Sequence, residues 1–251
     1  MNSGLPKENI YGHIKKLRFI LENIKKYKSM HGDLISLLDF GCGNGSAVSQ
    51  FLIQDGVNYY GIDIHEPSLD YAKKHFANEN ALFINHIPEG ILFDVIVYAD
   101  VLEHLDDPIS ILQQHYNLLK ENGIIIGAVP NGFGPFENEK RIDKFLGFSR
   151  GILLASKIKR RMLKRISSSR SSIIPYNSDS GHVQFFTKKS LLLTLQKGGF
   201  QIKCFRKGAF IGAPLSERIL RGKRIIELNS KIADYLPYWA VSTWYFVAKK
   251  L

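Results

Sequence analysis

The stretch that decides the fold of this chain reads Leu37-Leu38-Asp39-Phe40-Gly41-Cys42-Gly43-Asn44-Gly45. It ends a short apolar run that begins at Leu34, and it precedes a segment, 46–54, whose apolar residues have helical spacing. Glycines at alternate positions let the backbone turn tightly and let a ligand approach without a Cβ in the way. The pattern therefore predicts a strand, a ligand-binding loop and a helix in succession.

Short apolar runs alternate with helical patterns along most of the chain, which is typical of a parallel α/β sheet covered on both faces. The predicted strands are 34–40, 58–64, 81–84, 93–98, 124–129, 200–205 and 241–249. The predicted helices are 7–30, 46–54, 67–76, 108–119 and 190–197, the fourth with a C-cap at Asn122-Gly123. Ligands of such sheets bind beyond the carboxyl ends of the strands. We therefore expect the chemistry in loops 39–46, 63–67, 85–90, 98–104 and 130–136.

An acidic residue, Asp63, stands twenty-four residues after Asp39, at the predicted end of the second strand. A carboxylate there can bind the two hydroxyls of a ribose. A dinucleotide-binding fingerprint would need glycine where this chain has Ser46, whereas the observed spacing is D-x-G-x-G-x-G. An acid on the strand suits a cationic ligand better than a diphosphate. A glycine-rich turn without a ligand is the remaining interpretation, and the strand, the helix and Asp63 together count against it.

The D-x-G-x-G-x-G spacing resembles motif I of the class I S-adenosylmethionine-dependent methyltransferases. The stretch 93–108, FDVIVYADVLEHLDDP, resembles the fourth-strand motif of their small-molecule branch, which includes the ubiquinone-biosynthesis O-methyltransferases. Two more stretches, LLKENGIII at 118–126 and WYFVAKK at 244–250, resemble the turn into the fifth strand and the last, antiparallel strand of the family. The resemblance covers about 33–135 and 181–251.

This resemblance implies a Rossmann-like α/β fold: a seven-stranded, mostly parallel sheet with helices on both faces and an antiparallel last strand. A helical, basic insertion would follow the fifth strand. The chain would be a single methyltransferase domain, 1–251. Its parts would be a leading helix at 1–32, a cofactor-binding core at 33–135, a basic insertion or lid at 136–180, and the completion of the sheet at 181–251.

S-adenosylmethionine is the cofactor that the resemblance implies, and its contacts follow position by position. The loop at its methionine end would comprise Asp39, Gly41, Cys42, Gly43 and Gly45. Asp63 would take the ribose hydroxyls and Ile64 would lie beside the adenine. Asn85 or His86 would flank the edge of the base, while Tyr98, Ala99 and Asp100 would line the methionine moiety. The chain departs from the family where an acid usually contacts the adenine amine, because Asn85-His86 offers none.

Methyl transfer to a hydroxyl needs alignment of the two reactants and a base, and histidine is the natural base near neutral pH. His104, just beyond the fourth strand, and His182, where the chain returns to the core, are the candidate catalytic residues. Structural roles are the alternative for both histidines. Asp100 is a candidate for orienting the acceptor or binding the cofactor's amine. Glu103, His104 and Asp106 suggest metal ligands, but their spacing does not place all three on one face, so we expect no metal.

The basic charge of the chain is concentrated in one segment. Of the net charge of +11, the stretch from Glu137 to Arg170 carries +8, with eleven Lys and Arg against three acids. Its amphipathic part, 141–166, predicts either a lid packed on the core or contact with an anionic membrane surface and a lipid-linked acceptor. Nucleic acid is the disfavoured partner, because no RNA-binding module is visible and the fourth-strand stretch lacks an Asn/Asp-Pro-Pro-aromatic motif.

Two cysteines, a polar N-terminus and the shortness of the apolar stretches favour a cytoplasmic protein, at most peripheral to the inner face of a membrane. The predicted function is S-adenosylmethionine-dependent O-methylation of a small molecule, a sugar or glycolipid, or a lipid-linked hydroxyl, by in-line transfer with a histidine base. The alternatives are an RNA or protein methyltransferase and a non-catalytic S-adenosylmethionine-binding scaffold. The identity of the acceptor and the oligomeric state stay open.

Overall fold

The computed structural model describes residues 9, 11–146, 175, 181–212, 216 and 222–251. Its strands are β1 (Ile35–Phe40), β2 (Val57–Ile62), β3 (Ala81–Ile84), β4 (Phe93–Ala99), β5 (Leu119–Pro130), β6 (Phe200–Lys207) and β7 (Thr243–Lys250). Its helices are α1 (His13–His31), α2 (Ser49–Leu52), α3 (Glu66–Phe76), α4 (Pro108–Leu118), α5 (Pro135–Leu146), α7 (Lys188–Lys197) and α9 (Lys223–Tyr235). Two 3-10 turns, η1 (Leu102–His104) and η2 (Tyr238–Ala240), complete the described elements.

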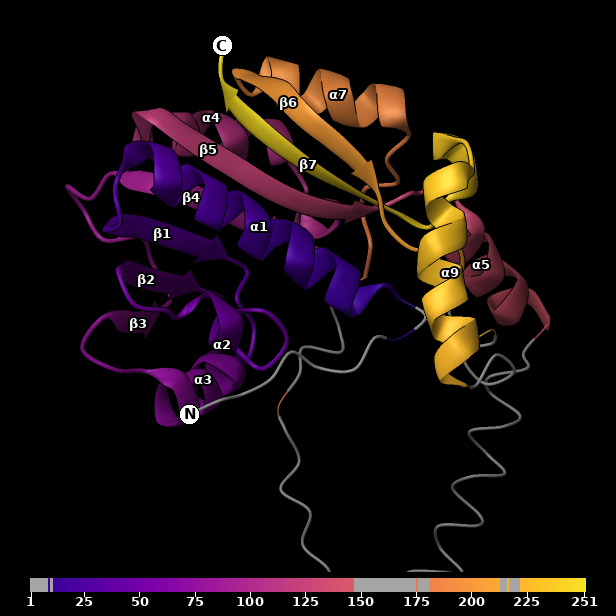
Figure 1. Ribbon diagram of the computed structural model, residues 1–251, viewed down its shortest axis with the longest axis horizontal. Coiled ribbons are helices and arrows are strands. Elements are labelled where there is room, and N and C mark those ends of the chain that lie inside the picture. Colours follow the sequence, from indigo (N-terminus) through magenta and orange to yellow (C-terminus); the bar gives the residue numbers. More distant parts are fainter. Residues whose placement is uncertain (1–8, 10, 147–174, 176–180, 213–215, 217–221) are drawn as a thin grey trace, which may run out of the picture.

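The seven strands form one sheet in the order β3-β2-β1-β4-β5-β7-β6 (Figure 1). The pairs β1–β2, β1–β4, β2–β3 and β4–β5 are parallel, while β7 is antiparallel to both β5 and β6. The predicted Rossmann-like, mostly parallel sheet with an antiparallel last strand is therefore confirmed. The strand order reverses between β1 and β4, and this switch point is where such sheets bind ligands.

Helices cover both faces of the sheet, as Figure 1 shows for α1 in front of the strands. On that face, α1, α2 and α3 pack on alternate residues of the central strands, such as Leu37 and Val95. The other face, with Leu38 and Ile96, packs against α4 and α7. The alternation follows from the two-residue period of a strand. No described helix combines the length and the hydropathy needed to cross a bilayer.

Two predicted helix boundaries differ from the structure for local reasons. Helix α2 spans only four residues, because the Asn44 side chain accepts hydrogen bonds from the backbone N–H and the hydroxyl of Ser46 and holds a turn there. Helix α4 ends at Leu118, so the predicted C-cap at Asn122-Gly123 is wrong. These two residues lie within β5, whose pairing with β4 is irregular between Phe93 and Val95.

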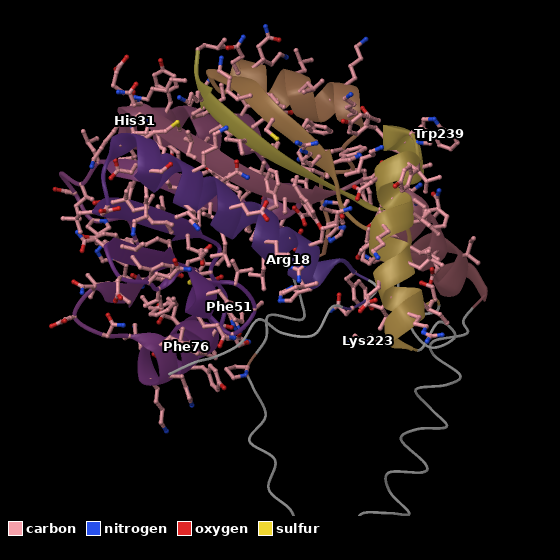
Figure 2. All side chains as sticks on the ribbon, in the orientation of Figure 1. Arg18, His31, Phe51, Phe76, Lys223 and Trp239 are labelled. Carbon is pink, nitrogen blue, oxygen red and sulfur yellow. The ribbon has the colours of Figure 1, made fainter. Side chains whose placement is uncertain are left out.

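The region after β5 contains two helices, α5 and α9, that the sequence pattern did not predict as distinct elements. Helix α5 forms the start of the predicted insertion, while 147–174 and 176–180 lie outside the described residues. Helix α9 has no counterpart among the predicted helices. It is held to α1 by Lys15, whose Nζ donates to the carbonyl of Ser230 and pairs with Asp234 at 2.7 Å. Figure 2 labels Lys223 at its start and Trp239 just beyond its end.

Candidate active site

A cavity of about 870 Å³ opens at the carboxyl ends of β1, β2 and β4. Its wall includes the glycine loop, the residues after β2 and the end of β4. It also includes η1, the first turns of α5, the segment at 181–182 and residues of α1. Ligand pockets are roughly 300–1,000 Å³ in volume, so this cavity has room for a nucleotide-sized ligand and a second small molecule.

The glycine loop is fixed by backbone hydrogen bonds to the neighbouring strand. The N–H groups of Gly41 and Cys42 both donate to the carbonyl of Ile62, at 2.7 and 2.9 Å. Gly41 has φ +77°, and a Cβ there would lie 2.5 Å from a methyl of Val101. A Cβ on Gly43 would meet nothing within 4 Å, which leaves open space above the loop. The loop therefore presents bare backbone to the cavity, as the sequence predicts.

Asp63 links this loop to the end of β2. Its Oδ2 accepts a hydrogen bond from the N–H of Gly43, and its Oδ1 accepts one from the N–H of His65, each at 2.8 Å. A carboxylate has about four acceptor positions, so both oxygens can still accept a bond from a diol in the cavity. Ile64, the next residue, is 87% exposed and lines the same wall. A carboxylate beside an apolar side chain suits a ribose and its base.

Asp39 supports the loop from below. It is buried, and its Oδ2 accepts hydrogen bonds from the hydroxyls of Ser49 and Tyr59, each at 2.7 Å. Burial raises the pKa of Asp39, while the two hydroxyls act in the opposite direction. The residue also lines the cavity, so a cation bound above the loop would stabilise its ionised form.

Asp100, at the end of β4, is the one non-glycine residue with a positive φ, +59°, in the described part of the chain. Such a conformation is strained for most residues and more tolerable for Asp. Its carboxylate pairs with Nζ of Lys16, which reaches the cavity from α1. A carboxylate and an ammonium together suit the charged end of an amino acid. Sequence reasoning missed Lys16, because it is one of several lysines on an amphipathic helix.

Four of the predicted cofactor residues do not line the cavity: Gly45, Asn85, His86 and Tyr98. Ala99 does, but Tyr98 points to the opposite face of the sheet, because successive side chains alternate along a strand. Its hydroxyl bonds to Nδ1 of His115 in the core. Asn85 donates instead to Glu66 at 2.8 Å, and Nδ1 of His86 lies 2.9 Å from the amide oxygen of Asn85. The prediction that Tyr98, Asn85 and His86 surround the ligand is therefore corrected for their side chains.

The two candidate bases meet on the other side of the cavity. The ring centroids of His104 and His182 lie 4.9 Å apart. The carbonyl of Glu103 accepts the backbone N–H groups of Val183 and Gln184, each at 2.9 Å, and this brings the two distant segments together. Nδ1 of His104 lies 3.0 Å from the carbonyl of Gly181. Burial and the nearby His182 lower the pKa of His104, which favours its neutral form.

Glu103 places a buried carboxyl group beside these rings. The side chain is 1% exposed, lines the cavity, and its Oε2 has no hydrogen-bond partner among the described residues. Burial and the charge of Asp100 raise the pKa of Glu103. Buried polar atoms are almost always paired, so this oxygen marks a position for a polar atom of a ligand.

One oxygen of Glu103 and one ring nitrogen each of His104 and His182 lie within 4.8 Å of one another. A single hydroxyl oxygen or a metal ion between them would therefore be within reach of all three. The grouping differs from the one considered in the sequence, because His182 takes the place of Asp106.

Behind His182 lies a second acid that sequence reasoning missed. Glu137, in the first turn of α5, is 3% exposed, and its Oε1 lies 2.8 Å from Nδ1 of His182. Burial alone would raise the pKa of Glu137, but the contacts with His182 and Lys140 hold it below the usual value. The carboxylate is therefore ionised. No motif could have indicated this residue, because Glu137 lies in a segment whose composition only indicates positive charge.

Comparison with known proteins agrees with this geometry. A family described as a methyltransferase domain matches residues 11–204. This chain belongs to that family. Its fold is that of S-adenosylmethionine-dependent methyltransferases.

Curated relatives are ubiquinone biosynthesis O-methyltransferases. The chain is 36% identical over 108 residues to that of Actinobacillus pleuropneumoniae serotype 7, which covers 38% of this chain and 45% of the relative. It is 35% identical over 128 residues to that of Pelagibacter ubique, which covers 46% and 52%. The chain thus spans about half the length of the curated relatives it matches.

Solved structures share the fold. An O-methyltransferase from the trans-AT PKS multienzyme of Brevibacillus brevis, in complex with S-adenosyl-L-homocysteine, aligns with a TM-score of 0.54 and 16% identity. The alignment covers 95% of this chain and 71% of that one. At this identity the likeness concerns the architecture of the methyltransferase domain.

Proposed function

We propose that this chain transfers a methyl group from S-adenosylmethionine to the hydroxyl oxygen of a small molecule, a sugar or glycolipid, or a lipid-linked acceptor. One observation carries the proposal. The glycine loop with Asp63 and the cluster of Glu103, His104 and His182 line one and the same cavity. The name that the curated relatives share, O-methyltransferase, supports oxygen as the atom that is methylated.

The donor side of the cavity fits the parts of S-adenosylmethionine. Asp63 would accept the ribose hydroxyls, and Ile64 would lie against the adenine. Above the glycine loop, Asp100 would accept from the amino group and Lys16 would pair with the carboxylate. When bound, S-adenosylmethionine supplies a methyl group attached to a sulfonium sulfur. The sulfur leaves as a neutral thioether, so its departure needs no acid. Asp39 and Asp100 add negative charge next to that cation, which favours binding.

The acceptor side would orient a hydroxyl and take its proton. Oε2 of Glu103 is one of three buried side-chain atoms without a hydrogen-bond partner among the described residues, with Nδ1 of His182 and Oγ of Ser230. Because Glu103 lines the cavity, its Oε2 would bind the acceptor's polar group. Either His104 or His182 would serve as base, because both line the cavity next to Glu103. Alignment of the hydroxyl with the methyl and removal of its proton are the contributions that such a transfer needs from a protein.

The basic segment 141–166 extends the proposal to anionic or lipid-linked acceptors. Helix α5 contains its start, and Lys140 already contributes an ammonium group to the cavity wall. Replacement of Arg160, Arg161, Lys164 and Arg165 by Glu should abolish sedimentation with phosphatidylglycerol vesicles at low salt. Equal sedimentation of the wild type and this variant would show that the segment does not recruit the enzyme to anionic lipid.

Calorimetry with S-adenosylhomocysteine, followed by mass spectrometry of metabolite and lipid extracts, tests the function itself. We expect one-to-one binding and the appearance of a methylated hydroxyl compound. Absence of binding to folded protein would contradict the proposal. Binding without methylation of any extract, RNA or protein would favour a non-catalytic binding protein. Methylation confined to RNA or protein would replace the small-molecule acceptor.

A further inference from the structure

We propose that His182 is the base of the methyl transfer and that Glu137 is the residue that positions it. The inference rests on the proposed function and goes further, because it chooses between two histidines and adds a residue that does not contact the acceptor. It follows from two observations: His182 lines the cavity, and the buried Glu137, which does not line it, contacts His182.

The contact between the two residues determines which nitrogen of His182 carries the proton. Oε1 of Glu137 is 2.8 Å from Nδ1, and an ionised carboxylate can only accept a hydrogen bond. Nδ1 makes no hydrogen bond of good geometry among the described residues, and a hydrogen on this nitrogen can turn toward the carboxylate. The proposed tautomer therefore has its hydrogen on Nδ1 and its lone pair on Nε2, on the other side of the ring. This is the logic of the carboxylate–histidine pairs of hydrolases, in which the acid fixes the tautomer and stabilises the imidazolium.

His104 lacks this support. The partner of its Nδ1 is the neutral carbonyl of Gly181, and Nε2 lies 3.9 Å from the carboxyl group of Glu103. A carbonyl dipole stabilises a developing imidazolium less than a full negative charge does. His104 then contributes by packing against the ring of His182 and by holding the 181–184 segment in place.

Glu137 is itself held in position by its burial and by Lys140. The side chain is almost fully buried, it lies on the first turn of α5, and Nζ of Lys140 pairs with it at 3.4 Å. In the transfer, the O–H bond of the acceptor breaks and its proton goes to Nε2 of His182. The electron pair left on the acceptor oxygen forms the bond to the methyl carbon. The bond between that carbon and sulfur breaks, and its electron pair stays on sulfur. The imidazolium later returns its proton to solvent.

Kinetics of five variants test this assignment. Glu137→Gln keeps the shape but removes the charge, and we expect kcat to fall about 100-fold, as for lost orienting partners, with the KM of the acceptor within about twofold. Glu137→Asp should recover most of the loss. Glu139→Gln, on the same helix and away from His182, is the matched control and should leave kcat unchanged. Adding Glu137→Gln to His182→Ala should have no further effect.

Nitrogen-detected NMR of the histidine rings gives a readout independent of turnover. We expect the His182 tautomer with hydrogen on Nδ1 in the wild type, and a mixture of tautomers in Glu137→Gln. Wild-type kcat in Glu137→Gln, an additive loss in the double variant, or hydrogen on Nε2 would overturn the inference. Chelator-sensitive turnover restored by a divalent metal would also overturn it, because His182 would then be a ligand. Failure to bind S-adenosylhomocysteine would instead contradict the proposed function.

Discussion

The two halves of the cavity are built in different ways. The donor half, formed by the glycine loop 39–46, Asp63–Ile64 and Ala99–Asp100, consists of loops at the ends of adjacent parallel strands, tied together by backbone N–H groups. The acceptor half, formed by Glu103, His104, Glu137 and His182, consists of side chains from η1, α5 and the 181–187 segment, all outside the sheet. The first half suits a constant ligand, whereas the second can change without disturbing the sheet.

If the halves are separate, the largest effect on donor binding should come from Asp63→Ala. The variant loses the acceptor of two ribose hydroxyls and the anchor of Gly43, so S-adenosylhomocysteine should bind about 100-fold more weakly. Calorimetry measures this loss. Asp70→Ala, an exposed acid on α3 that lies outside the cavity, is the control. If Asp63→Ala and the wild type bind S-adenosylhomocysteine with similar affinities, Asp63 does not bind the donor.

His104→Ala, a variant in the acceptor half, tests whether that half can change without affecting donor binding. We expect kcat to fall about tenfold, because the ring packs on His182 and contacts the carbonyl of Gly181, while the affinity for S-adenosylhomocysteine stays within about twofold. His75→Ala, an exposed histidine on α3, should leave both quantities unchanged. A loss of donor affinity as large as the loss of kcat in His104→Ala would mean that the halves are not independent.

Asp39→Asn should sharpen the comparison, because it separates ligand binding from stability. The variant should bind S-adenosylmethionine about tenfold more weakly and be about 1 kcal/mol more stable at pH 8. Burial raises the folded pKa of Asp39 above its unfolded value. The wild type therefore loses stability relative to the variant as pH rises through the folded pKa, and the difference vanishes at acidic pH. Urea unfolding at pH 4 and pH 8 measures the difference in the free energy of unfolding between the variant and the wild type. A difference that is larger at pH 4 than at pH 8 would contradict this pH dependence.

The smallest effect is expected for Asn85→Ala. Its side chain bonds Glu66 outside the cavity, so the affinity for S-adenosylhomocysteine should change by less than about twofold. A drop of tenfold or more in calorimetry would show that the donor half extends to the loop after β3, as the sequence resemblance implies.

The same difference between the halves explains what the sequence could predict. The donor half lies in contiguous motifs, so Asp39, Gly41 and Asp63 could be located from their spacing, together with the strands that they follow. The alternation of Val97, Tyr98 and Ala99 along β4 places the Tyr98 side chain on the face opposite to its two neighbours.

The acceptor half could only be predicted in part. His104 and His182 were found as isolated candidates, but their contact depends on two hydrogen bonds from the 183–184 backbone to Glu103. Glu137 and Lys16 approach the cavity through tertiary packing of α5 and α1, and no local pattern distinguishes them from other charged residues on those helices. The sequence gives the identity of each side chain, whereas the residues that the side chain contacts depend on the fold.

The most direct measurement is the structure of the wild-type protein with S-adenosylhomocysteine bound. We predict ribose hydroxyls on Asp63, the homocysteine end between the glycine loop and Asp100, and the sulfur facing the cluster of Glu103, His104 and His182. A ribose away from Asp63, or a sulfur that faces away from this cluster, would contradict the assignment of one cavity to donor and acceptor.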